Sequence, residues 1–137
     1  MGTLIFEHTK HKEMWDWLSK NPTETKNSFF DIHRDTHTDY PLNGCYACEY
    51  ASSVGIVIEI ANWGGPTEMC DNCPLNLPNG CSDASFYDTW YAAQPQLIYL
   101  LTHKDSDSPM IKEFTKIVQN AAMQIRDAPV KGHVITR

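Results

Sequence analysis

The most regular pattern of apolar and polar positions lies near the end of the chain. From Pro109 onward, apolar residues recur three and four positions apart, as they do on one face of an amphipathic helix. Ser108 is a favoured N-cap residue, and Pro109 suits the first helical position. The pattern predicts a helix that ends at Ala128-Pro129. Its expected inner face comprises Ile111, Phe114, Ile117, Val118, Ala121, Ala122 and Ile125.

A second amphipathic helix is predicted over residues 9–20. His11, Trp15 and Leu18 fall at positions i, i+4 and i+7, which places them on one helical face. Thr9 is suited to the N-cap, and the Asn-Pro pair at 21–22 ends the pattern. We therefore expect this helix to pack its aromatic face against the core.

The rest of the chain gives less regular patterns. A short helix starting at Thr23 is expected to carry Phe29 and Phe30 to the core, and residues 31–44, rich in Asp, His and Thr, indicate a loop. The β-branched run VGIVIEI at 54–60 predicts a strand. A helix is expected from residue 82 or 83 to 90, and residues 96–101 either continue it or form a buried strand.

These elements together predict an α+β fold, with two or more helices and a short β-sheet or hairpin around a cysteine-containing loop region. The chain has 137 residues, of which 42% are hydrophobic and 20% charged, so we expect one domain over 1–137. No apolar run approaches the roughly 18 residues of a membrane span, and the first residues lack the layout of a secretory signal. The expected location is the cytoplasm, with reduced thiols.

The net charge of −6 is unevenly distributed. Residues 35–103 contain no Lys or Arg and eight acidic residues, whereas residues 104–137 contain six basic and four acidic residues. Proteins that bind nucleic acids neutralise phosphates with Lys and Arg, and the middle of this chain offers none. Direct binding of DNA or RNA through this region is therefore not expected.

Five cysteines between positions 45 and 81 carry the clearest chemical signal. Two C-x2-C pairs separated by 21 residues are typical of a zinc site with four thiolate ligands. The predicted ligands are Cys45, Cys48, Cys70 and Cys73, with Cys81 as an alternative ligand. A closed site of this kind is structural, so zinc would stabilise the domain. A redox pair and plain buried thiols are the other interpretations of the same cysteines.

Other candidate sites are less specific. His33 and His37 flank Asp35, which suggests either a further metal site, the histidine of a nuclease finger, or simply a hydrophilic surface loop. The chain is rich in Trp and Tyr, whose rings stack on nucleobases or anchor partner proteins. We expect Trp17, Arg34, Trp63 and Tyr87 to contribute to binding. No motif indicates an activated nucleophile, so catalysis is not expected.

Several segments resemble a group of small cysteine-rich phage and prophage proteins. The similar segments are HKEMWDWL at 11–18, CYACEYA at 45–51, CDNCPL at 70–75, FYDTW at 86–90 and IRDAPVK at 125–131. The group has no established activity, so the resemblance implies an origin in phage. It also implies that Cys45, Cys48, Cys70, Cys73 and Cys81 supply metal ligands.

Two functions from different classes follow. The first is a non-enzymatic phage accessory protein that uses its acidic, aromatic surface to bind and inhibit a host protein, such as a defence factor, in the host cytoplasm. The alternative is a protein that sequesters a nucleotide signal, with the base stacked on Trp or Tyr and the phosphate at Arg34 or a C-terminal Lys. A zinc-finger nuclease is a third hypothesis, against which the missing central bases argue.

Overall fold

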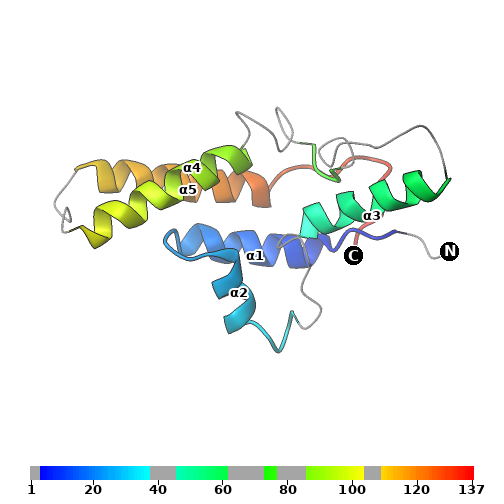
Figure 1. Ribbon diagram of the computed structural model, residues 1–137, viewed down its shortest axis with the longest axis horizontal. Helices are drawn as coiled ribbons and strands as arrows, with labels where there is room; N and C mark the ends of the chain where they lie inside the picture. The colour runs from blue at the N-terminus through cyan, green and yellow to red at the C-terminus, as the bar shows by residue number, and fades with distance from the viewer. Residues whose placement is uncertain (1–3, 38–45, 62–72, 77–85, 104–108) are drawn as a thin grey trace.

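The computed structural model describes residues 4–37, 46–61, 73–76, 86–103 and 109–137. The helices in these ranges are α1 (His8–Lys20), α2 (Lys26–Ile32), α3 (Tyr46–Ala61), α4 (Phe86–Thr102) and α5 (Pro109–Arg126). Helices α4 and α5 pack side by side, and α1 packs against α5 (Figure 1). Helix α2 contacts α1 and lies near its C-terminal end. Helix α3 packs against α1 and extends toward the side where both chain ends lie.

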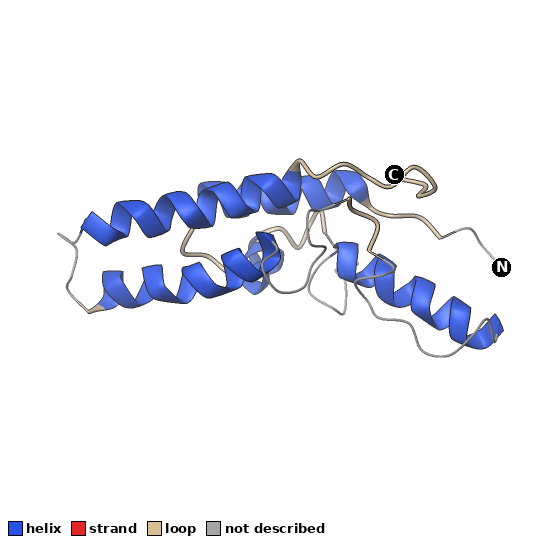
Figure 2. Ribbon diagram, turned by 90° about the horizontal axis from the view of Figure 1, so that it is seen from above, coloured by secondary structure: helices blue, strands red, loops and turns tan. Residues whose placement is uncertain are grey.

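The predicted α+β fold is wrong for the described part of the chain. Its β structure amounts to two isolated bridges, Phe6 with Thr136 and Leu75 with Val130, and no sheet is formed there. Figure 2 accordingly shows the described residues as helices joined by loops. The described part of the chain is built as a helical bundle, in which helices bury apolar faces against their neighbours.

The expected strand at 54–60 is also wrong, because these residues continue helix α3. β-branched residues lower helix propensity only slightly, so tertiary packing decides their state. The first turns of α3 bury Tyr46, Ala47 and Ala51, which recur at helical spacing. A helix docked through these residues satisfies its own backbone hydrogen bonds, whereas a strand would need a partner strand.

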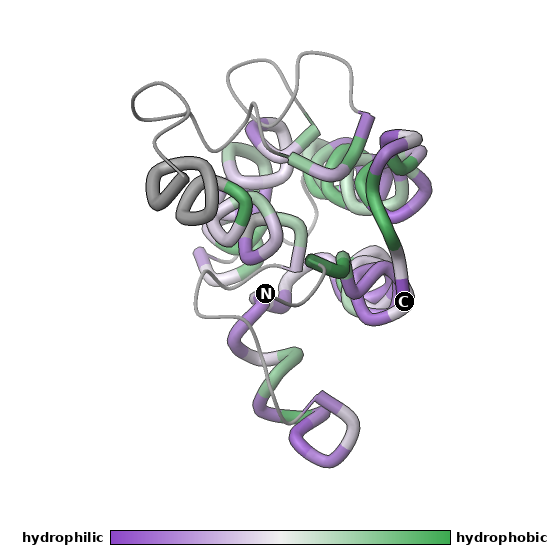
Figure 3. Tube along the Cα trace, turned by 90° about the vertical axis from the view of Figure 1, so that its right-hand side faces the viewer, coloured by the Kyte–Doolittle hydropathy of each residue, from purple (hydrophilic) through white to green (hydrophobic). Residues whose placement is uncertain are grey.

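Helix α5 confirms the helix predicted at the end of the chain. Val118, Ala121, Ala122 and Ile125 are fully or almost fully buried, so small side chains let α5 approach its neighbours closely. Ile117 was expected on the same face, but 41% of it is exposed. Figure 3 shows the mixed hydropathy along the helices that is typical of amphipathic packing.

Helix α1 is close to its prediction and lies at the centre of the core. The predicted inner residues His11, Trp15 and Leu18 are completely buried, together with Met14. The Trp15 ring meets Tyr87 and Trp90 of α4 edge-on, with ring centres 5.4 and 5.2 Å apart. Such edge-to-face pairs add about 0.5–1.5 kcal/mol beyond the burial of apolar area.

Helix α2 begins at Lys26, later than the start at Thr23 that the sequence suggests, because Thr25 is its N-cap. The Thr25 hydroxyl accepts a hydrogen bond from the Ser28 backbone N–H at 3.1 Å. Phe29 and Phe30 are buried as predicted. The capping hydrogen bond therefore sets the start of α2 and with it the position of its first residue, Lys26.

Helix α4 is continuous across both segments that the sequence left separate. Residues 96–101 extend the helix that contains Trp90, so the alternative of a buried strand is wrong. Pro95 lies inside α4 and has no backbone N–H to donate to the carbonyl of Tyr91. This break in the helical hydrogen bonding lies beside a cavity described below.

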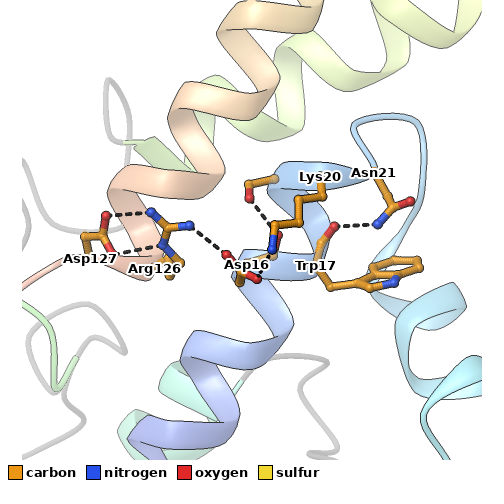
Figure 4. A network of polar contacts seen from close by, with 7 residues as sticks. Asp16, Trp17, Lys20, Asn21, Arg126 and Asp127 are labelled. Atoms are coloured by element: carbon orange, nitrogen blue, oxygen red, sulfur yellow. Dashed lines mark hydrogen bonds and ion pairs between the residues drawn. The ribbon is translucent and has the colours of Figure 1, made fainter.

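A polar network fastens α1 to α5 (Figure 4). Arg126 at the end of α5 donates to Asp16 of α1 at 2.7 Å and also pairs with Asp127 at 2.8 Å. Asp16 in turn accepts from Lys20 at 2.9 Å. These hydrogen bonds lower the pKa of Asp16 and raise that of Arg126. The ion pairs fix the relative register of the two helices at the edge of the core.

The segment after α5 runs back to both the N-terminal segment and residues 73–76. The Phe6 N–H donates to the Ile135 carbonyl at 2.8 Å, and the Arg137 N–H donates to the Phe6 carbonyl at 3.0 Å. The Lys131 N–H donates to the Pro74 carbonyl at 2.9 Å. These backbone bonds place Arg137 next to the start of α1.

Candidate functional site

The predicted zinc ligands fall largely outside the described residues. Cys45, Cys70 and Cys81 are not among the described residues. Cys48 lies in the first turn of α3, but the position of its side chain is not described. The prediction that Cys48 lies in a loop is wrong, since this residue is part of helix α3. Cys73 is 6% exposed and packs in the core. Within the described segments, no group of three or more His, Cys, Asp or Glu residues is placed to hold a metal ion. Zinc binding by the cysteines stays a prediction.

The predicted binding residues do not form one site. Tyr87 is 4% exposed and belongs to the core beside Trp15, so it offers little surface to a ligand. Trp17 packs half-buried against Phe29, with ring centres 5.6 Å apart. Arg34 is exposed and pairs with a carboxylate one turn earlier, and Trp63 lies outside the described residues. None of the described three lines either of the cavities presented below.

The segment with His33 and His37 is only partly the surface loop that its sequence suggests. Arg34 and Asp35 are exposed, but His37 is 1% exposed. The His37 ring lies 4.8 Å from that of Phe29, centre to centre, and both of its nitrogens are hydrogen-bonded. A histidine with both nitrogens bonded has no lone pair left for a metal, so a metal site at His37 does not fit this geometry.

The feature that stands out is a lysine surrounded by aromatic rings. The Lys26 ammonium lies 4.8 Å from the ring centre of Tyr91 and 5.5 Å from that of Trp15. It is also 5.9 Å from the ring centres of both Tyr87 and Trp90. All four distances are within the roughly 6 Å over which a ring attracts a cation. Lys26 also donates a hydrogen bond to the Tyr91 hydroxyl.

Lys26 and Tyr91 line a cavity of about 310 Å³ between α2 and α4. We call it the α2–α4 cavity. Its lining residues are Thr25, Lys26, Asn27, Trp90, Tyr91, Gln94 and Pro95. The volume is at the lower end of the range of about 300–1,000 Å³ for small-molecule sites. The lining combines aromatic surface, polar groups and a single formal charge, that of Lys26.

Hydrogen bonds from α4 hold one wall of this cavity in place. The buried Gln94 amide donates to the backbone carbonyls of Pro22 and Glu24, at 3.2 and 2.5 Å. These bonds tie the segment before α2 to α4. Because Thr25 caps α2 directly after this segment, the position of Lys26 over the aromatic rings follows from the two anchors.

The Lys26 ammonium retains donors for a ligand, whereas the indole N–H of Trp90, which has no hydrogen-bond partner in the described part of the chain, is buried. The Tyr91 carbonyl does not receive the helical hydrogen bond that residue 95 would normally donate, because that residue is proline. An ammonium group has three N–H donors, of which Lys26 gives one to Tyr91. The cavity can therefore offer two further ammonium donors to an acidic group.

The sequence contains one signal for this site that the sequence analysis did not use. Tyr87, Trp90, Tyr91 and Gln94 occur at positions i, i+3, i+4 and i+7, so a helix brings them to one face. Lys26 had no comparable signal, since its hydrogen-bond partner Tyr91 is 65 residues away in the chain. Only the fold, through the side-chain contacts of Lys26 with residues of α1 and α4, brings this charge to the aromatic face.

None of the described helices is long and apolar enough to cross a membrane. Comparison with known proteins gives no relative for this chain: no family model, no curated protein and no solved structure matches it.

Proposed function

We propose that this protein binds a small ligand that joins a planar ring to an acidic group, and that nucleotides are the ligand class. The observation that carries the proposal is the Lys26 ammonium, held 4.8 Å from the ring centre of a Tyr91 side chain that is 52% exposed. The two residues line the same cavity. A base stacked on Tyr91 would bring its phosphate within reach of Lys26.

The charge of the surroundings favours this choice of ligand. Lys26 is the one formal charge among the residues that line the α2–α4 cavity. No carboxylate pairs with it in the part of the chain that the structure describes. An acidic ligand would supply the missing counter-charge, and a charge-assisted hydrogen bond contributes about 1.5–3 kcal/mol.

Nucleotide sequestration is one of the functions that the sequence suggests, but the proposed residues differ. Arg34 or a C-terminal Lys was expected to meet the phosphate, and we now give that role to Lys26. A Trp or Tyr ring was expected to stack on the base, with Trp17 among the candidates, and we now give that role to Tyr91. Inhibition of a host protein stays a prediction, for which the described residues supply no specific observation.

Two substitutions test the site. Lys26→Met keeps most of the length of the side chain and removes its charge, and Tyr91→Ala removes the exposed ring. Each is expected to weaken nucleotide binding about tenfold to a hundredfold, which corresponds to about 1.4–2.8 kcal/mol. Binding is followed by the fluorescence of the tryptophans, two of which lie within 6 Å of the Lys26 ammonium.

Matched controls exist on the helices α4 and α5. Lys112→Met removes an exposed charge from α5, and Tyr99→Ala removes a ring of α4 that is 55% exposed. Neither residue lines the α2–α4 cavity. If these controls weaken binding as much as Lys26→Met and Tyr91→Ala do, the ligand site is elsewhere and the proposal fails.

A further inference from the structure

A second cavity lies at the opposite end of α1 from Lys20, and nothing in the proposed function uses it. It has a volume of about 540 Å³ and is lined by Glu7, Thr9, Lys10, Glu13, Thr36 and Arg137. We call it the charged cavity. Its lining shares no residue with the α2–α4 cavity. The lining carries two acidic and two basic side chains, so its formal charge is zero.

One acid and one base of this lining are already paired. Arg137 donates two hydrogen bonds to the Glu7 carboxylate, one of them from Nε at 2.9 Å. This pairing lowers the pKa of Glu7, although partial burial works in the other direction. Glu7 and Arg137 therefore neutralise each other within the lining of the cavity.

The other acid, Glu13, is held by a buried histidine. The His37 Nε2–H donates to one oxygen of the Glu13 carboxylate at 3.0 Å. His37 Nδ1 lies 2.5 Å from the Tyr46 hydroxyl, which must be the donor because Nε2 already carries the ring proton of a neutral imidazole. Burial lowers the pKa of His37 and raises that of Tyr46 to about 12, consistent with this arrangement of protons.

This chain of hydrogen bonds leaves half of the Glu13 carboxylate for a ligand. No hydrogen bond to its second oxygen is found in the described part of the protein, and the side chain is 56% exposed. An exposed glutamate normally samples many rotamers, whereas Glu13 is oriented by a histidine that is 1% exposed. An oriented and accessible carboxylate is suited to receive a cation.

The second base, Lys10, lies one helical turn before Glu13 on α1. Residues three apart on a helix have Cβ atoms about 5–6 Å from each other, which is close enough for an ion pair. Both residues lie in the described range 4–37, and they do not form an ion pair with each other. Lys10 nevertheless acts on this region, since its charge lowers the pKa of both Glu7 and His37.

We propose that the charged cavity binds the zwitterionic head group of a free α-amino acid. The ligand ammonium meets the open oxygen of Glu13, and the ligand carboxylate meets Lys10. The hydroxyls of Thr9 and Thr36 line the same cavity and can hydrogen-bond to either group. A ligand with only one of the two charges would contact Glu13 or Lys10, but not both.

The first experiment screens the twenty standard α-amino acids against the full chain by ligand-observed NMR. At about 2 mM each, a concentration at which all twenty dissolve, a ligand with a Kd in the low millimolar range is detected. An amino acid that binds is then compared with its two singly charged analogues, which for L-phenylalanine are phenethylamine and 3-phenylpropionate. The proposal predicts at least tenfold weaker binding of both analogues.

Two variants assign the binding to this cavity. Glu13→Gln and Lys10→Met should each weaken amino-acid binding at least tenfold, whereas Glu113→Gln and Lys112→Met, on α5, should leave it unchanged. Nucleotide binding in the α2–α4 cavity should be the same in all four variants. The proposal is overturned if no amino acid binds, if a singly charged analogue binds as well as the amino acid, or if Glu13→Gln has no effect.

Discussion

The Tyr46 hydroxyl donates its hydrogen bond to Nδ1 of His37 at 2.5 Å, and both residues are almost completely buried. Tyr46 is the first residue of α3, and His37 follows the turn after α2. Because His37 also bonds to Glu13 of α1, three parts of the molecule meet at one imidazole. A buried polar network of this kind contributes when every member is satisfied and becomes costly when one is removed.

Tyr46→Phe should therefore destabilise the protein. The substitution keeps the ring and removes the hydroxyl, so that a buried nitrogen of His37 loses its donor. We expect the free energy of unfolding to fall by about 1–3 kcal/mol, as measured by urea denaturation. Tyr99→Phe is the control, since Tyr99 is 55% exposed, and it should change stability by less than about 0.5 kcal/mol. Equal stability of both variants would mean that the His37–Tyr46 bond contributes nothing.

Stability should also depend on pH through His11. This residue is completely buried, its Nε2 lies 3.0 Å from the Ile125 carbonyl, and burial lowers its pKa to about 4. In the unfolded chain the pKa is about 6.5, so the unfolded state takes up the proton first as the pH falls. The contribution of neutral His11 is thus fully present above about pH 6.5 and is lost between there and pH 4.

The expected loss over this window is about 3 kcal/mol for one proton. In His11→Gln, whose amide can still donate to the Ile125 carbonyl, the free energy of unfolding should fall less steeply over the same range. His103→Gln, at an exposed position, should keep the steep dependence. Parallel curves for His11→Gln and the unsubstituted protein would show that His11 does not cause the pH dependence.

The zinc prediction is tested by mass. Native mass spectrometry of protein purified without added metal should give a mass one zinc ion above the denatured mass, and chelation should unfold the protein. Cys45→Ser should abolish the bound metal. Comparison of Cys70→Ser with Cys81→Ser then decides which of these two thiols is a ligand. A metal-free, folded protein with accessible cysteines would favour redox chemistry instead.

The sequence predicts best the helices that have a regular periodic face. In α1, three of the residues expected to point inward are completely buried, and in α5 the predicted stripe holds at Val118, Ala121, Ala122 and Ile125 but not at Ile117. The strand predicted at 54–60 fails because β-branched residues occur in helices when packing requires it. Here the packing is supplied by Tyr46, Ala47 and Ala51, outside the window that suggested a strand.

The candidate sites are harder to predict because their residues are distant in sequence. Tyr91 is one of the Trp and Tyr residues in which the chain is rich, but its partner Lys26 lies on another helix. His37 was assigned to a hydrophilic loop because its neighbours are polar, and its burial depends on contacts with Glu13 and Tyr46. Sequence patterns report which face of an element is apolar, not which distant polar side chains that face brings together.

The measurement that tests the proposed function most directly is a calorimetric titration of the full chain with the four ribonucleoside monophosphates and with their parent nucleosides. Each pair shares the ring and differs in the acidic group. We predict that at least one monophosphate binds at least tenfold more tightly than its nucleoside, and that Lys26→Met removes this difference. If no monophosphate binds, or if the preference for the phosphate persists in Lys26→Met, the α2–α4 cavity is not a nucleotide site.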